Sequence, residues 1–182
     1  MADENLAPYV NEVKRVVANP HRFPKDMSKV LDHLYIGTYT DAVEVEILKK
    51  HGITHIINCV EDTSGYRHQY KTGPSFYGDE FKYHGFMSED EDSYPIMQHF
   101  EETYGFIEDA RLREGKCLIH CMAGINRSGV LAVAYVMVHL NIGPISAAKL
   151  VLQARGMILR NEGFIEQLVK LAAAKNLLLK DE

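Results

Sequence analysis

The stretch Lys116-Cys-Leu-Ile-His-Cys-Met-Ala-Gly-Ile-Asn-Arg-Ser-Gly129 decides how this chain folds. A short apolar segment, 117–120, enters the stretch and has the length and composition of a buried strand. The residues that leave it, 128–140, are apolar on nearly all sides and predict a helix buried at the centre of the fold. Between strand and helix lies a tight loop that opens with Cys121 and closes with Arg127. We therefore expect the chemistry of this chain in that loop.

The composition fits one globular domain. The chain has 182 residues, of which 46% are hydrophobic and 25% charged, enough for one substantial core. Its net charge of -5 argues against a general binder of nucleic acid or anionic membranes. The three cysteines are too few for a disulfide framework, and the N-terminus lacks the pattern of a signal peptide. The longest apolar run, 130–138, is shorter than the roughly 20 residues that span a bilayer. We therefore expect a soluble protein of the cytoplasm, the nucleus or both.

The remaining sequence alternates helix and strand patterns, which predicts an α/β fold with a central, mostly parallel (mixed) β-sheet flanked by helices. Helices are expected at 5–19, from a cap at Thr40 or Asp41 to Gly52, from Ser93 to about Gly115, at 128–140, at 145–155 and after a cap at Asn161. Strands are expected at 30–37, 53–60, 81–87 and 117–120. A long surface loop at 61–80 and an acidic loop at 88–92 join these elements. Loops of such length are often functional.

Cys121 is the candidate nucleophile. It lies where a strand ends and a helix begins. The helix dipole and the free backbone N–H groups at such a point favour the anionic form of a thiol. We therefore expect Cys121 to react as a thiolate.

The rest of the loop has the features of a phosphate cradle. Arg127 follows Cys121 closely, and its planar guanidinium group can bind two phosphate oxygens at once. Residues 122–126 include no acidic side chain, so their N–H groups can turn inward as an anion-binding nest. Ser128 places a hydroxyl beside the sulfur, where it can stabilise the thiolate as a leaving group. The residues expected to bind the substrate are Met122, Ala123, Gly124, Ile125, Asn126 and Arg127.

A nucleophile in a phosphate cradle implies phosphoryl transfer through a cysteinyl-phosphate intermediate. The departing alkoxide or phenoxide then needs a general acid from outside the loop. The acidic loop is the obvious source, and its residue types leave four candidates. These are Glu89, Asp90, Glu91 and Asp92.

The segment 120–129 resembles the signature of cysteine-dependent protein phosphatases, and of the small atypical dual-specificity branch in particular. The resemblance extends from about Val30 to Leu171, with further matches at Leu34-Tyr-Ile-Gly37, Gly52-Ile-Thr-His-Ile-Ile-Asn58 and Asn161-Glu-Gly-Phe164. It implies an N-terminal helix and connector at 1–29, a catalytic domain at 30–177 and a tail at 178–182. The implied activity is hydrolysis of phosphotyrosine and of phosphoserine or phosphothreonine in phosphoprotein substrates, without a cofactor.

The resemblance also assigns roles to single residues. In the family, the general acid is an aspartate shortly before a helix phenylalanine, and Phe100 then indicates Asp90. The catalytic residues implied are Cys121, Arg127, Asp90 and Ser128. His120 is expected to orient the loop and to tune the thiol. Some members carry a cysteine that closes a disulfide on the nucleophile during oxidation, which makes Cys59 a candidate redox partner of Cys121.

Besides a phosphoinositide phosphatase, which would be expected to carry lysine within residues 122–126, two alternatives remain open at this point. Asn126 stands where protein phosphatases more often carry serine, and asparagine resembles the RNA 5'-triphosphatase branch. An RNA 5'-triphosphatase-like enzyme is therefore one alternative, although a nucleic-acid partner is not favoured. The other is a phosphate-binding adaptor without turnover, which the presence of both Cys121 and Arg127 disfavours. No metal site is expected, because the histidines lack a coherent ligand spacing. Those considered are His51, His55, His68 and His84.

Overall fold

A five-stranded β-sheet lies at the centre of the computed structural model, which describes residues 5–62 and 72–181. Its strands are β1 (Ser28–Leu31), β2 (Leu34–Gly37), β3 (Ile53–Asn58), β4 (Lys82–Gly85) and β5 (Lys116–His120). They follow the order β1-β2-β5-β3-β4. The pair β1 and β2 is antiparallel, and all other neighbours are parallel. The predicted α/β fold with a mostly parallel mixed sheet is thus confirmed.

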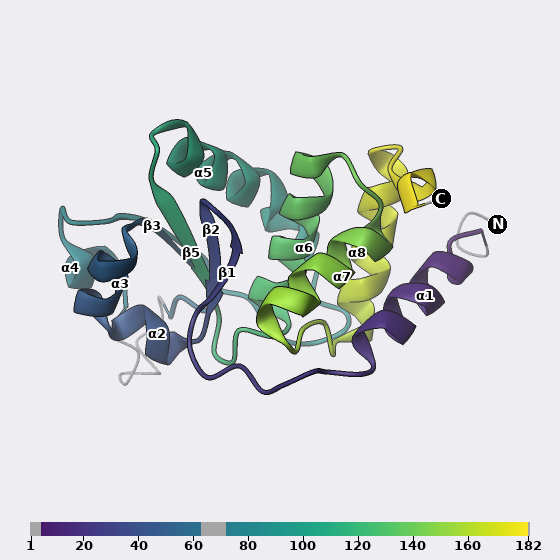
Figure 1. Ribbon diagram of the computed structural model, residues 1–182, viewed down its shortest axis with the longest axis horizontal. Coiled ribbons are helices and arrows are strands. Elements are labelled where there is room, and N and C mark those ends of the chain that lie inside the picture. Colours follow the sequence, from purple (N-terminus) through teal and green to yellow (C-terminus); the bar gives the residue numbers. More distant parts are fainter. Residues whose placement is uncertain (1–4, 63–71, 182) are drawn as a thin grey trace.

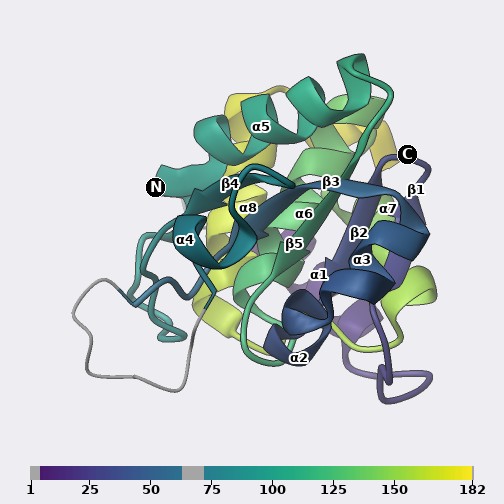
Figure 2. The same cartoon turned by 90° about the vertical axis from the view of Figure 1, so that its left-hand side faces the viewer.

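Helices cover both faces of the sheet (Figure 1). One face carries the short helices α2 (Tyr39–Val43), α3 (Val45–His51) and α4 (Pro74–Tyr77), which lie in front of the strands in Figure 2. The opposite face carries α5 (Phe100–Leu112), α6 (Arg127–Leu140), α7 (Pro144–Arg155), α8 (Glu162–Ala174) and α1 (Ala7–Val17). Two short 3-10 helices complete the chain, η1 (Ile96–His99) and η2 (Leu178–Asp181). The second occupies most of the predicted tail.

Alternate residues of the strands build two separate cores, one on each face. Leu118 of β5 packs in the same cluster as Tyr35 and Ile56, on the side of α2 and α3. Its neighbours Cys117 and Ile119 point to the other face and join the larger cluster around α6. This alternation follows from the two-residue period of a β-strand. It makes β5 the buried middle strand from which the candidate loop departs.

Helix α6 is the buried centre that the sequence predicts. Every residue from Val130 to Met137 is fully buried. Helix α1 covers this core from outside, because Val13 and Val17 share its hydrophobic cluster and α1 packs on α7 and α8. The predicted helix at 5–19 therefore exists and is docked, while the division of the chain at residue 29 stays a prediction. Within the described residues, no helix is both long and apolar enough to cross a membrane.

The structure corrects three local predictions. Part of the surface loop predicted at 61–80 forms α4, in which Tyr77 is buried, while residues 63–71 of that loop lie outside the described residues. The single strand predicted at 30–37 is a hairpin, in which β1 turns back onto β2 and adds an edge to the sheet. The helix predicted from Thr40 or Asp41 begins instead after Thr38, which has extended backbone angles. Thr38 and Asp41 cap each other's backbone N–H groups, and the helix breaks at Glu44 into α2 and α3. The cap therefore lies earlier, because Asp41 serves as the partner in the third helical position rather than as the cap itself.

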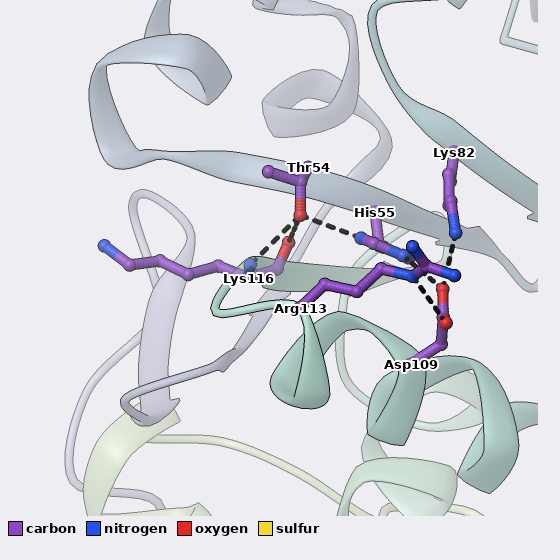
Figure 3. A network of polar contacts seen from close by, with 6 residues as sticks. All are labelled: Thr54, His55, Lys82, Asp109, Arg113 and Lys116. Atoms are coloured by element: carbon purple, nitrogen blue, oxygen red, sulfur yellow. Dashed lines mark hydrogen bonds and ion pairs between the residues drawn. The ribbon is translucent and has the colours of Figure 1, made fainter.

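A polar network at the end of the sheet remote from Cys121 fixes α5 to the strands (Figure 3). Asp109 of α5 binds His55 Nε2 of β3 at 3.0 Å and Lys82 Nζ of β4 at 2.7 Å. Thr54 Oγ1 donates to Lys116 O of β5 at 3.3 Å and accepts from Lys116 N at 3.1 Å. The three parallel strands and α5 are therefore held in register where they begin, and their other ends carry the candidate site.

Candidate active site

The loop from Cys121 to Asn126 leaves the carboxyl end of β5 and leads directly into α6. Because β5 lies between β2 and β3, both sides of this end are flanked by strands. Ligands of parallel sheets usually bind at this edge. Cys121 is only 2% exposed. Cys121 therefore lies in the loop between the end of β5 and the start of α6, as the sequence predicts.

Two donors point at the sulfur of Cys121. The backbone N–H of Gly124 donates to Sγ over 3.2 Å, and the hydroxyl of Ser128 donates to Sγ over 3.3 Å. Hydrogen bonds donated to a sulfur stabilise it as a leaving group. The structure therefore brings Ser128 to the place where its predicted role requires it.

Four consecutive carbonyl groups of the loop accept hydrogen bonds from outside it. The pairs are Met122 O with Tyr39 N (3.2 Å), Ala123 O with Arg155 Nη2 (3.4 Å), Gly124 O with Arg155 Nε (3.1 Å) and Ile125 O with Leu159 N (3.0 Å). In a trans peptide the N–H points away from the C=O of the same unit. The N–H groups of residues 123–126 therefore turn to the concave side, where Cys121 lies, and this is the arrangement that the predicted anion-binding nest requires.

Gly124 is the residue that lets the loop curve. Its φ of +63° lies in the left-handed region, and a Cβ there would stand 2.4 Å from Gly37 O and 2.5 Å from Arg155 Nη2. Both the backbone angle and the close approach therefore require glycine.

Arg127 is the first residue of α6 and is 8% exposed. Its Nη1 donates to the carbonyl oxygen of Ser88 over 3.0 Å, which places the guanidinium group beside the acidic loop. Its Nε is buried and has no hydrogen-bond partner among the described residues. A buried donor without a partner is costly, and an anion in the nest would supply the missing acceptor.

Asp90 is joined through Asn126 to the loop of residues 121–126, called the phosphate loop below. The Nδ2 group of Asn126 donates to Oδ1 and Oδ2 of Asp90 over 3.1 and 3.0 Å, and Asn161 Nδ2 donates to Oδ1 over 3.1 Å. The other end of the Asn126 amide, Oδ1, accepts from the backbone N–H of Arg160 at 2.7 Å. Within the described chain, Asp90 is the one among the four acidic candidates that bonds to this loop.

The acidic loop also rests closely on the start of α8. A Cβ on Gly163 would stand 2.0 Å from the backbone oxygen of Asp92. Asn161 caps α8 as predicted, since its side chain accepts from Phe164 N over 3.0 Å. The cap of α8 and the acidic loop are therefore held by the same asparagine.

Arg155 is a site residue that the sequence does not reveal. Its side chain is completely buried at the end of α7 and donates to two carbonyls of the loop, as described above. Its Nη1 donates on the other side to Asp26 O over 2.6 Å and to Ser28 Oγ over 3.3 Å. The sign in the sequence would be a charged residue in line with the apolar positions of helix 145–155, which alone does not name its partner.

Arg155→Lys is expected to lower kcat/KM by about 10- to 100-fold, because one ammonium group cannot hold both carbonyls and the nest loses its shape. Steady-state kinetics on an aryl phosphate measure this, and a larger change in KM than in kcat would indicate a weakened phosphate cradle. Arg22→Met is the matched control, since Arg22 donates from an exposed position to Ala154 O. Equal loss in both variants would show that Arg155 acts only on stability.

His120 and Cys59 lie buried behind the nucleophile. Burial lowers the pKa of His120 to about 4, so its ring is neutral at pH 7. The backbone N–H of Cys59 donates to His120 O over 2.9 Å. Burial, and then the charge of Cys121, raises the pKa of the Cys59 thiol. Both cysteines are free thiols in the structure, and the redox pairing of Cys59 with Cys121 stays a prediction.

Stability should fall between pH 6.5 and 4 in part through His120. Its folded pKa lies below the usual unfolded value of about 6.5, so the unfolded chain binds the proton first and acidification favours unfolding. The contribution is complete above pH 6.5 and lost by pH 4. Urea unfolding at several pH values checks this, and His120→Asn should flatten the slope in that window. An unchanged slope would contradict a neutral buried His120.

A cysteine nucleophile in a loop shaped to hold a tetrahedral anion is the arrangement of the cysteine-dependent phosphatases. The match to protein-family models narrows the class: residues 34–174 fit the model of the dual specificity phosphatase catalytic domain. The chain belongs to this family, as the resemblance of segment 120–129 predicts.

Named relatives and solved structures support the assignment to this family. The chain is 37% identical over 142 residues to human dual specificity protein phosphatase 22, covering 78% of this chain and 71% of that protein. The crystal structure of DUSP15 superposes with a TM-score of 0.72 at 33% identity, covering 82% of this chain and 89% of that one. The human tyrosine phosphatase-like serine/threonine/tyrosine-interacting protein superposes with a TM-score of 0.75 at 31% identity, covering 83% and 98%.

The chain spans only part of several relatives. It covers 20% of the rat protein phosphatase Slingshot homolog 3, at 32% identity over 141 residues. It covers 63% of dual specificity protein phosphatase 22 of Xenopus tropicalis, at 38% identity over 142 residues. The similarity therefore concerns the catalytic domain.

Proposed function

We propose that this chain is a protein phosphatase that hydrolyses phosphotyrosine and phosphoserine or phosphothreonine in phosphoprotein substrates of the cytoplasm or nucleus. The observation that carries the proposal is the position of Cys121 Sγ, which accepts hydrogen bonds at the floor of a nest of inward-facing N–H groups. Family membership supports the same reaction. A pure phosphate-binding module has no use for a nucleophile at this point.

In the first step the Cys121 thiolate attacks phosphorus, and the bond from phosphorus to the ester oxygen breaks. The loop N–H groups and Arg127 hold the three remaining oxygens and stabilise their charge. Asp90 gives its proton to the departing oxygen, so the leaving group is an alcohol or a phenol. The product left on the enzyme is a cysteinyl-phosphate.

In the second step water attacks the phosphorus of this intermediate. Asp90, now a carboxylate, takes the proton from the water. The sulfur–phosphorus bond breaks, and the Ser128 hydroxyl, 3.3 Å from Sγ, stabilises the departing thiolate. Inorganic phosphate leaves and the thiolate is restored. The cycle consumes one phosphate monoester and one water and needs no further reactant.

The loop side chains favour a monoester over a triphosphate end. The side chains of residues 122–126 are all uncharged, whereas several linked phosphates would need several cations. Asn126, which keeps the RNA 5'-triphosphatase alternative open, uses its amide to bind Asp90 and the backbone of Arg160. Its presence is therefore explained without an RNA substrate.

Hydrolysis assays on four substrates test the proposal. They are an aryl phosphate, a phosphotyrosyl peptide, a phosphothreonyl peptide and an RNA with a 5'-triphosphate, each with wild type and Cys121→Ser. We expect turnover of the aryl phosphate and both peptides by the wild type alone. Preference for the RNA would favour the triphosphatase. Tight binding of the phosphopeptides without turnover would favour the adaptor.

A further inference from the structure

Two histidines and one glutamate meet at the end of α6 that lies farthest from the phosphate loop. His33 comes from the turn between β1 and β2, Glu108 from α5, and His139 from the last turn of α6. One ligand atom from each lies within 4.8 Å of the others. His139 Nδ1 is 3.0 Å from Glu108 Oε1, and the rings of His33 and His139 meet edge to face with centroids 5.1 Å apart.

We propose that His33, Glu108 and His139 form a binding site for a transition-metal dication, with Zn²⁺ as the best match. Two imidazole nitrogens and one carboxylate oxygen are a donor set that suits zinc and its neighbours in the first transition row. Calcium and magnesium need more oxygen donors than this cluster offers. Small side-chain shifts would place each of the three ligand atoms roughly 2.0–2.2 Å from a zinc ion, the bond length that zinc requires.

The surroundings of the cluster leave room for a bound ion and for a water molecule as its fourth ligand. The side chains of His139 and Glu108 are 21% and 18% exposed, so an ion can enter and keep a water as a fourth ligand. The three residues stand on a tight turn and two packed helices, which fixes their backbones. Fixed backbones of this kind let residues that are distant in sequence act together as metal ligands.

Neighbouring groups already orient the ligands. Tyr135 is fully buried beneath them, donates to Glu108 Oε1 over 2.6 Å and lies 2.7 Å from His33 Nε2. Arg111 donates to both carboxylate oxygens, with Nη2 2.6 Å and Nε 3.0 Å from Glu108 Oε2 and Nε 3.2 Å from Oε1. Glu108 Oε1 thus faces the histidines. Such outer partners commonly fix the orientation of metal ligands, while the positive charge of Arg111 weakens the attraction for a cation.

The site is separate from the reaction. His139 lies twelve positions after Arg127 in α6, or about 18 Å along the helix at 1.5 Å per residue. A metal here would join the β1–β2 turn, α5 and α6, and its effect would be on stability. Zinc also binds free thiolates, so Cys121 must be removed before the site is measured.

Calorimetric titration of Zn²⁺ into Cys121→Ser protein near neutral pH tests the proposal, with Co²⁺ absorption as the second readout for tetrahedral nitrogen and oxygen ligands. We expect one ion bound and a raised melting temperature. His33→Gln and His139→Gln should each weaken binding at least tenfold, whereas the exposed control His21→Gln should not. Absence of binding, or binding that survives both cluster variants, would overturn the site.

Arg111→Gln keeps all three ligands and makes the test independent of a loss of folding. Removing one positive charge beside a dication should tighten Zn²⁺ binding by about tenfold, by Coulomb's law in a water-like dielectric. If Arg111 acted on this cluster only through its hydrogen bonds, its removal would not increase the affinity for Zn²⁺. Unchanged Zn²⁺ binding by folded Arg111→Gln protein would place the ion elsewhere and refute the proposal.

Discussion

Cys121→Ser is expected to lower kcat on an aryl phosphate by a factor on the order of 10⁶, the scale of losing the nucleophile in a covalent mechanism. A serine hydroxyl needs a base to become a nucleophile. Asp90 is already needed as the acid of this step, and the ring nitrogens of the buried neighbour His120 bond to no other group among the described residues. The nest, however, keeps its N–H groups, so phosphate binding should survive.

Two measurements separate this prediction from a loss of folding. The melting temperature of Cys121→Ser should stay close to that of the wild type, because the substitution is nearly isosteric. Its affinity for a phosphotyrosyl peptide, measured without turnover, should also be retained. Cys117→Ala is the control, since Cys117 lies on β5, the strand that leads to Cys121, and its side chain is fully buried in the core. A Cys121→Ser enzyme that turns over near the wild-type rate would refute the mechanism.

What the sequence predicts well is what depends on near neighbours along the chain. The strand, the loop and the helix around Cys121 follow one another directly, so their order alone puts the thiol at a helix N-terminus. The Asn161 cap is equally local. The Thr38 cap is local as well, because Thr38 and Asp41 have the spacing of a capping box, so the sequence pattern contained this cap although the prediction placed it at Thr40 or Asp41.

What the sequence leaves out depends on contacts between distant segments. Arg155 reaches the phosphate loop, Asp26 and Ser28 at once, and no spacing rule connects these positions. The cluster of His33, Glu108 and His139 could not be predicted for the same reason, since its members come from three separate elements. Asn126 is an intermediate case: it is visible as a departure from the family, but its bonds to Asp90 appear only once the acidic loop is placed.

Asp90→Asn is expected to lower kcat on an alkyl phosphate, such as a phosphothreonyl peptide, by about 10²–10⁴-fold, the usual value of a general acid. An alkoxide is a poor leaving group and cannot depart without a proton. An aryl phosphate with a strongly acidic phenol needs that proton much less, so the loss there should be far smaller in the first step. Single-turnover kinetics on both substrates measure the difference. Glu91→Gln is the control, because Glu91 is an exposed neighbour in the same loop.

Asn126→Ser tests whether the clamp on Asp90 matters as well as its carboxyl group. Serine is too short to reach both Asp90 and the backbone N–H of Arg160, which Asn126 bridges over 3.0 and 2.7 Å. Asp90 would then be poorly positioned, and kcat on the alkyl phosphate should fall by about 10- to 100-fold, with a smaller effect on the aryl phosphate. In the double variant with Asp90→Asn this further loss should vanish, because there is no acid left to position. Additive losses would instead assign Asn126 to phosphate binding, and full activity of Asp90→Asn on the alkyl phosphate would move the proton donor to Asp92 or Glu89.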